Sequence, residues 1–301
     1  RLHSPMLEAA LVEGLSQGGV DVVRIGLGPS PMLYFAERHL EVDGGIHVTA
    51  SHNPAQDNGF KLVLQHRPFF GEDLQDLAAL AAAGDWTSGA GVVSEVNVSD
   101  AYVARLLEGQ SGAGFRIGWD CGSGATGPVI EKLVKLLPGE HHLLHAEVDG
   151  HFPHHHPDPT VEANLADLRA LVAAKRLDFG LAFDGDGDRI GAVDGQGRVL
   201  WGDQILAILA EPVLAAYPGS PVVADVKASR YVFVRITALG GRPVMAKTGH
   251  SSIKTRMREL GAPIAGELSG HIFFAELGGH DDALFAAMRL LAALAGSARS
   301  L

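Results

Sequence analysis

Three aspartates alternate with two glycines in the segment 184–188, and this spacing is the most specific chemical pattern in the chain. Because only glycines separate them, Asp184, Asp186 and Asp188 can turn their carboxylate oxygens toward one hard cation. Without a cation, three negative charges so close together would repel one another. Arg189 follows directly and could bind a phosphate or pair with an aspartate. The alternative interpretation is a plain Asp-Gly turn in a hairpin.

An EF-hand calcium loop does not fit this segment. Counted from Asp184, the sixth position is Arg189 where the EF-hand has glycine, and the twelfth is Gly195 where it has glutamate. A tight loop with few ligands instead fits Mg²⁺, which completes its octahedron with outside oxygens, typically from a phosphate. The sequence therefore predicts one Mg²⁺ ion at this loop.

The segment 49–54 places a hydroxyl group where a nucleophile could lie. It follows an apolar run that is typical of a strand, and it contains Ser51 and His52 before a proline turn that leads to Lys61. A serine oxygen beside a base and a cation is an arrangement that can activate a nucleophile. Taken alone, a Ser-His pair is more often part of a surface loop. The polar loops further along the chain favour the catalytic interpretation.

Polar side chains also end several apolar runs in the last third of the chain. Glu267, Ser269 and His271 occur within five residues and offer the donors and acceptors that bind neighbouring hydroxyls of a sugar. Lys227 and His250 lie at the ends of two other predicted strands. Each of these residues could instead belong to a solvated strand end or the polar tip of a hairpin.

Two further patterns indicate structure more than chemistry. Residues 122–127 match the glycine spacing of a dinucleotide-binding loop, but the next acidic residues, Glu147 and Asp149, come late for such a site. A tight turn between a strand and a helix is therefore favoured. A group of histidines could bind Zn²⁺, but no cysteine lies nearby and prolines interrupt the run, which favours an irregular loop between domains. These histidines are His151, His154, His155 and His156.

Composition excludes several classes of function. The chain has 301 residues, 47% of them hydrophobic and 20% charged, which is enough for two or three domains with buried cores. A net charge of −11 argues against binding to nucleic acid or to an acidic membrane, but a few local cations would suffice for a phosphorylated small molecule. Every apolar stretch is shorter than the roughly 20 residues of a membrane span. The single cysteine, Cys121, fits a reducing cytoplasm.

Strand and helix patterns alternate along the chain, which predicts an α/β protein with mixed, largely parallel sheets. The predicted strands are residues 20–26, 46–50, 115–120, 143–148, 177–183, 221–225 and 242–246. The predicted helices are residues 6–17, 31–39, 71–83, 128–137, 161–175, 204–216, 230–239, 252–260 and 283–295.

These elements form three consecutive predicted domains of similar topology. In each domain an apolar strand runs into a polar loop that contains glycine, and ligands of α/β proteins bind at such carboxyl ends of strands. We therefore expect the three loops to converge on a central cleft. The predicted domains, which hold the serine, the metal and the sugar-binding loop respectively, are residues 1–97, 98–198 and 199–301.

In combination, the motifs resemble the α-D-phosphohexomutase superfamily, and most closely its bacterial phosphomannomutase/phosphoglucomutase members. The resemblance extends over essentially the whole chain. It rests on the sequences TASHNP with NGFKL, DGDGDR, KTGHS and GELSGH, which occur here in this order.

The resemblance implies a Mg²⁺-dependent isomerase that interconverts the 1-phosphate and 6-phosphate of a hexose, mannose or glucose. Ser51 would carry the transferred group as a phosphoserine and would bind Mg²⁺ together with the three aspartates of the segment 184–188. A hexose 1,6-bisphosphate would be the intermediate and the activator. The resemblance further places His52, Lys61 and Arg189 around the phosphoryl group, Glu267 and Ser269 at sugar hydroxyls, and Lys227, His250 and His271 near the reacting hydroxyl and phosphate.

The chain also departs from the family. Members begin with a strand and an arginine-bearing loop upstream of Arg1, and they end with a fourth domain whose loop binds the phosphate that is not transferred. We therefore expect a chain that is truncated at both ends and lacks the fourth domain. A sugar-phosphate phosphatase and a non-catalytic sugar-phosphate-binding fragment stay open as alternatives. A monomer or a weak dimer is expected.

Overall fold

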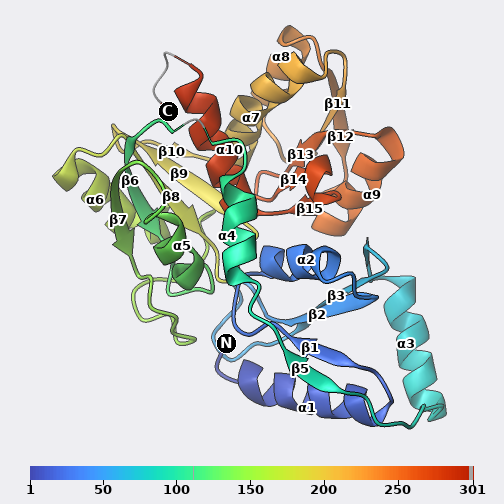
Figure 1. Ribbon diagram of the computed structural model, residues 1–301. Coiled ribbons are helices and arrows are strands. Elements are labelled where there is room, and N and C mark those ends of the chain that lie inside the picture. Colours follow the sequence, from blue (N-terminus) through green and yellow to red (C-terminus); the bar gives the residue numbers. More distant parts are fainter. Residues whose placement is uncertain (111, 298–300) are drawn as a thin grey trace.

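Three α/β units follow one another along the chain in the computed structural model, which describes residues 1–110, 112–297 and 301. Figure 1 shows the first unit below the other two, with a single helix, α4 (Ser99–Leu107), running between them. The three units confirm the predicted α/β class. In the described part of the chain, no helix is both long and apolar enough to cross a bilayer.

The first unit contains two small sheets. Strands β1 and β5 pair in parallel, and β2, β3 and β4 form an antiparallel sheet. Its helices lie within two residues of their predicted starts, whereas β3, β4 and β5 were not predicted. The elements are α1 (Ser4–Gln17), β1 (Val22–Arg24), α2 (Ser30–His39), β2 (Gly44–Val48), β3 (Phe60–Leu64), β4 (Arg67–Pro68), α3 (Glu72–Ala83) and β5 (Val93–Glu95).

The second and third units are each built on a five-stranded sheet. The elements that follow α4 in the second unit are β6 (Phe115–Asp120), α5 (Gly127–Leu133), β7 (Gly139–Leu144), the 3₁₀ helix η1 (Glu162–Leu165), α6 (Ala166–Lys175), β8 (Phe179–Phe183), β9 (Ile190–Asp194) and β10 (Val199–Leu200). Those of the third unit are α7 (Gly202–Ala216), β11 (Pro221–Asp225), α8 (Arg230–Ala238), β12 (Arg242–Ala246), α9 (His250–Leu260), β13 (Ile264–Gly266), β14 (Ile272–Phe274), the 3₁₀ helix η2 (Ala275–Leu277), β15 (His280–Asp281) and α10 (Ala283–Ala295).

The two five-stranded sheets have the same topology. Their strand orders are β7-β6-β8-β9-β10 and β12-β11-β13-β14-β15, so in both the second strand of the unit lies at an edge beside the first. The three strands at that side run parallel, and the last two join antiparallel. This shared order confirms the predicted repeat for the second and third units, while the first unit divides its strands between two small sheets. The boundaries between the domains stay a prediction.

Strand β8 shows why the sheets are stable. All five of its residues are buried, because α6 covers one face of the sheet while α7 and α10 contact its other side at β9. Phe179, Leu181 and Phe183 belong to the large core, and Ala182 belongs to a smaller core with Leu168. A strand buried on both faces reads as a continuous apolar run, as this one does.

Strand β7 corrects the prediction for its part of the chain. The apolar pattern predicted residues 143–148, but the strand starts at Gly139 and ends at Leu144. Within the described part of the chain it is an edge strand that pairs only with β6, so its polar residues Glu140 and His142 can face solvent. At His145 the backbone turns into the left-handed region, with a φ of 52°, and ends the strand.

Candidate active site

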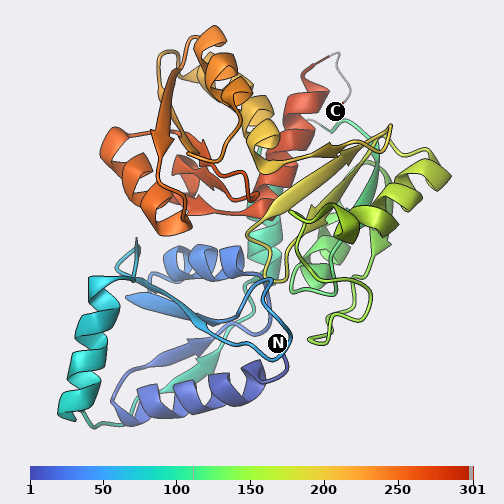
Figure 2. The same cartoon turned by 180° about the vertical axis from the view of Figure 1, so that it is seen from behind.

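The loops that follow β2 and β8 meet at the centre of the molecule. Figure 2 shows them from behind, where the first unit touches the second. The backbone N–H of Ser30 donates to the carbonyl of Asp186 over 2.8 Å, and the hydroxyl of Ser51 donates to the Asp184 carboxylate. The predicted convergence of serine and aspartates is therefore present in the structure.

The three aspartates form a buried cluster. Their exposed fractions are 0% for Asp184, 2% for Asp186 and 4% for Asp188, and one oxygen from each lies within 4.8 Å of the others. Burial and the neighbouring charges raise the pKa of Asp184 well above its ordinary range. Its Oδ1 accepts hydrogen bonds from the backbone of Asp188 and Arg189, over 3.0 and 3.1 Å.

The glycines of this loop are needed for its shape. Gly187 has a φ of 74°, a conformation that other residues adopt at a cost. A Cβ atom on Gly185 would lie 2.5 Å from the carbonyl oxygen of Ser51, closer than atoms can approach. The loop can thus press against the serine only because glycine occupies this position.

Lys61 neutralises two of the three aspartates. Its Nζ atom lies 2.7 Å from Oδ2 of Asp186 and also contacts Oδ2 of Asp188. Burial acts to lower the pKa of Lys61, but these two carboxylates raise it well above its ordinary value. The hydroxyls of Ser30 and Thr49 donate to the same Asp186 oxygen, over 2.7 and 3.0 Å.

One buried carboxylate oxygen of the cluster, Oδ1 of Asp186, nevertheless has no hydrogen-bond donor among the described residues. A buried oxygen without a partner is costly, and hard cations bind such oxygens. Together with the negative charge of the cluster, this observation shows that the donor set fits a divalent cation such as Mg²⁺.

Ser51 is held in an uncommon conformation at the tip of its loop. Its φ is 49°, and its N–H donates to the hydroxyl of Thr49 over 2.9 Å. Its Oγ atom lies 3.0 Å from Nδ1 of His52. Burial, reinforced by the charge of Arg189, lowers the pKa of His52, which keeps this imidazole neutral near pH 7. The guanidinium of Arg1 donates to the carbonyl of Ser51 over 2.9 Å and fixes the loop from outside.

The loop between β13 and β14 reaches the aspartates through His271. Nε2 of His271 lies 3.3 Å from Oδ1 of Asp188, and Nδ1 lies 3.0 Å from both Oε2 of Glu267 and Oγ of Ser269. Burial acts to lower the pKa of His271, but the carboxylates around it raise the pKa to about 10. His271 is therefore a cation at neutral pH. Glu267 also accepts the Gly249 N–H over 2.6 Å.

The structure brings together most of the predicted site residues. The contacts described above connect Ser51, His52, Lys61, Asp184, Asp186, Asp188, Glu267, Ser269 and His271, and Arg189 joins them through a backbone bridge to His271. His250 is the first residue of α9, with its ring centre 6.1 Å from that of His271. Lys227 lies exposed beyond the end of β11, without a side-chain hydrogen bond or ion pair to the described residues.

Sequence reasoning missed three residues of this site. Ser30 and Thr49 hold Asp186, and Arg1 holds the Ser51 loop. The only available signal was the Ser-Pro start of a helix for Ser30 and the position of Thr49 just before the serine loop. Neither pattern identifies the partner, because the contacts cross between units.

The glycine-rich segment 122–127 supports the aspartate loop. The N–H of Ala125 donates to the carbonyl of Gly185 over 3.0 Å, and a Cβ atom on Gly124 would lie 2.8 Å from the same oxygen. A tight turn that packs on a neighbouring loop needs glycine at this place, whether or not it binds a nucleotide.

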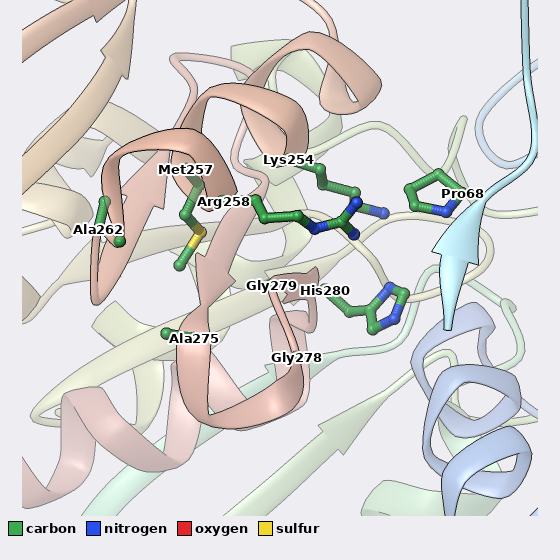
Figure 3. A pocket seen from close by; sticks show the side chains of 10 residues that line it. Pro68, Lys254, Met257, Arg258, Ala262, Ala275, Gly278, Gly279 and His280 are labelled. Carbon is green, nitrogen blue, oxygen red and sulfur yellow. The ribbon is translucent and has the colours of Figure 1, made fainter. Parts of the chain in front are cut away.

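A separate pocket of about 230 Å³ lies between the first and third units (Figure 3). Pro68 borders it on one side, and Lys254, Arg258 and His280 border it on the other. The ring of His280 stacks on Tyr34 with 4.3 Å between the ring centres. None of the predicted site residues lines this pocket, so it contributes to the contact between the units rather than to the cluster of aspartates.

Comparison with protein families covers nearly the whole chain. Residues 1–87 match the phosphoglucomutase/phosphomannomutase alpha/beta/alpha domain I, residues 100–197 match domain II, and residues 201–301 match domain III. The three matches follow the order of the three units described above.

Similar proteins carry the same family names. The chain is 42% identical over 301 residues to a phosphomannomutase/phosphoglucomutase of Pseudomonas aeruginosa and 40% identical over 301 residues to a phosphoglucomutase of Neisseria gonorrhoeae, with 99% of the chain covered in both. It spans 65% of the length of each relative. A crystal structure of a phosphoglucomutase/phosphomannomutase family protein from Burkholderia thailandensis matches with a TM-score of 0.93 and 40% identity, covering 98% of this chain and 66% of that one.

Proposed function

Because the chain belongs to the phosphoglucomutase/phosphomannomutase family of the α-D-phosphohexomutase superfamily, we propose that Ser51 accepts and returns a phosphoryl group while hexose 1-phosphate and hexose 6-phosphate are interconverted. The observation that carries the proposal is the hydrogen bond from the Ser51 hydroxyl to Asp184 in a buried acidic cluster. Phosphoryl transfer depends on positioning and on charge neutralisation. The residues around Ser51 and the acidic cluster are suited to provide both.

Asp184, Asp186 and Asp188 would hold Mg²⁺ together with an oxygen of Ser51. Oδ1 of Asp186, which has no donor among the described residues, supports this assignment. When bound, the ion supplies positive charge that stabilises the transferred phosphoryl group.

Lys61 and Arg189 would bind the oxygens of the phosphoryl group on Ser51. Lys61 already contacts two aspartates beside the serine, and Arg189 follows the third aspartate directly. Cations held in a buried site stabilise developing negative charge more strongly than they would in water. Any ion that neutralises the aspartates frees Lys61 to turn toward the phosphoryl group.

Of the two histidines, we propose that His250 is the base that accepts the proton of the substrate hydroxyl. His271 would instead act as a cation. Burial lowers the pKa of His250, so its imidazole is neutral and able to accept a proton. His271 has a pKa raised to about 10 and holds its proton. Groups whose environments push their pKa values apart can divide the roles of acid and base in this way. Lys227 would contact the substrate phosphate, and Glu267 and Ser269 the sugar hydroxyls.

The proposed cycle transfers the phosphoryl group from Ser51 to the free hydroxyl of a hexose phosphate. The P–O bond to Ser51 breaks as the bond to the sugar oxygen forms, and the sugar hydroxyl gives its proton to the base. The resulting hexose 1,6-bisphosphate turns in the cleft and returns its other phosphoryl group to Ser51. Trace bisphosphate would therefore activate the protein by phosphorylating Ser51.

One assay tests the proposal. The protein is incubated with glucose 1-phosphate, Mg²⁺ and a trace of glucose 1,6-bisphosphate, and glucose 6-phosphate and free phosphate are both measured. Glucose 6-phosphate that depends on Ser51 supports the mutase. Free phosphate alone would indicate a phosphatase. If neither glucose 6-phosphate nor free phosphate formed, both activities would be contradicted. Ser51→Ala is the test variant, and Ser16→Ala near the end of α1, where the half-buried serine donates to the Glu13 carbonyl of its own helix, is its control.

A further inference from the structure

A second group of metal-ligand side chains lies at the carboxyl ends of β6 and β7. Asp120 ends β6, His145 follows β7, and His155 lies in the segment that leads toward α6. One ligand atom from each residue lies within 4.8 Å of the other two. Asp120 is fully buried, and the side chains of His145 and His155 are 11% and 14% exposed. The group uses only one of the four histidines in the segment 151–156.

The hydrogen bonds of His155 define which nitrogen carries its proton. Nδ1 lies 3.0 Å from the carbonyl oxygen of His156, and because a carbonyl can only accept, Nδ1 is the donor. Nε2 then faces both carboxylate oxygens of Asp120, over 3.1 and 3.0 Å. In the neutral ring this nitrogen would turn a lone pair toward a carboxylate. The contact between Nε2 of His155 and the Asp120 carboxylate is favourable only if this nitrogen carries a second proton or if a cation lies between the nitrogen and the carboxylate.

His145 has a matching outer partner. Its Nε2 atom lies 3.1 Å from Oδ2 of Asp167, so a carboxylate is available to accept the N–H of one ring nitrogen. The ring is further fixed by stacking on His154, with 4.0 Å between the ring centres, and by an edge contact with His155. Histidines that bind metals almost always donate their other N–H to a carboxylate or a backbone carbonyl. His145 has a carboxylate partner in Asp167, and His155 has a carbonyl partner in His156.

We propose that Asp120, His145 and His155 bind one Zn²⁺ ion. His155 binds through Nε2, His145 through the nitrogen turned away from Asp167, and a water molecule takes the fourth position. Two imidazoles and one carboxylate suit Zn²⁺, whereas the all-oxygen cluster around Asp184 suits Mg²⁺. The chemistry of the ligands thus separates the two ions.

The ion would fix the segment around His155, which packs against the aspartate loop that contacts Ser51. Pro157, two residues after His155, lies against both Gly122 and Gly185, where a Cβ atom would come within 3.1 and 3.4 Å of it. Gly185 in turn packs against the carbonyl of Ser51. A zinc ion that links His155 to the end of β6 therefore braces the aspartate loop, and it takes no part in bond breaking.

Cobalt substitution tests the proposal. The chain is freed of metal with a chelator and titrated with Co²⁺, whose visible absorption reports nitrogen ligands in a four-coordinate site. We expect one equivalent of Co²⁺ to produce this absorption and one equivalent of Zn²⁺ to displace it. Elemental analysis after Zn²⁺ addition and desalting gives the stoichiometry. The same titration of Asp188→Asn should leave the absorption unchanged, because Asp188 lies outside the group of Asp120, His145 and His155.

The variants identify the ligands. His145→Gln and His155→Gln should abolish the Co²⁺ absorption, while His142→Gln should retain it, because His142 on β7 pairs with Glu140 outside the group. Asp167→Asn should weaken binding by about 10-fold, as expected for loss of an outer partner. This variant leaves all three ligands in place and covers the case in which a ligand variant fails to fold. Equal absorption in wild type and His155→Gln, or no Zn²⁺ retained by the wild type, would overturn the proposal.

Discussion

The hydroxyl of Ser51 donates a hydrogen bond to the carboxylate of Asp184, a residue 133 positions further along the chain. Asp186 and Asp188 are both paired with Lys61, so Asp184 is the aspartate of the cluster that faces the serine rather than the lysine. This division of partners assigns different tasks to three residues that are equivalent in the sequence.

Replacing Asp184 with asparagine should lower phosphoryl transfer to Ser51 by roughly 100- to 1,000-fold, the usual cost of losing one electrostatic contact in such a site. The amide keeps the shape of the side chain but removes its charge from the cation site. Single-turnover transfer from glucose 1,6-bisphosphate measures the effect. Asp149→Asn, in the same unit and with a side chain that is 42% exposed, is the control and should transfer at the wild-type rate. A rate near wild type in Asp184→Asn would argue against the assigned site.

Replacing Lys61 with methionine should destabilise the metal-free protein by about 3–5 kcal/mol, because the buried Asp186 and Asp188 lose their cation. Saturating Mg²⁺ should reduce the difference from wild type, since the ion supplies the missing charge. Urea unfolding with and without Mg²⁺ measures both values. Lys132→Met removes an exposed ion pair with Asp100 and should cost less than about 1 kcal/mol. A loss in Lys61→Met that Mg²⁺ does not change would contradict a cation site at these aspartates.

His280 should make the protein less stable in acid. Burial lowers its pKa to about 3 from the ordinary value of 6.5, so between these values the unfolded chain binds a proton that the folded chain refuses. Stability from this residue is present above pH 6.5 and is lost as the pH falls toward 3. His280→Phe preserves the stack on Tyr34 and removes two buried nitrogens that have no hydrogen-bond partner among the described residues.

The difference in unfolding free energy between His280→Phe and wild type should therefore favour the variant, and it should grow as the pH falls from 6.5. Chemical unfolding over a series of pH values measures it. His151→Phe, with a side chain that is 72% exposed, is the control and should show a much smaller pH-dependent difference. A pH-independent difference in His280→Phe would show that His280 takes up protons in the folded protein.

Local sequence patterns could predict the polar loops but not all of the strands around them. The residues around Ser51 and Asp184 follow apolar runs and stand out by type, so their place at strand ends could be inferred. Strands β9 and β14 follow tight turns and are short and buried, without the alternation that marks an exposed strand. The position of β7 was predicted wrongly because its residues Glu140 and His142 are polar, so this edge strand lacks the apolar pattern of a buried strand.

Contacts between units could not be predicted from one sequence. Thr49 and Ser30 hold Asp186 only because the first unit lies against the second, and nothing near Asp186 in the sequence indicates those partners. The histidine segment shows the same limit. Its own spacing favoured an irregular loop, and only the fold brings His155 to Asp120 and His145.

The most direct test of the central claim is to locate the phosphoryl group on the protein. The chain is incubated with radiolabelled glucose 1,6-bisphosphate, digested and analysed by mass spectrometry, with Ser51→Ala treated in parallel. The account predicts one labelled site, Ser51, and no label in the variant. Label on another residue, or equal labelling of Ser51→Ala, would contradict it.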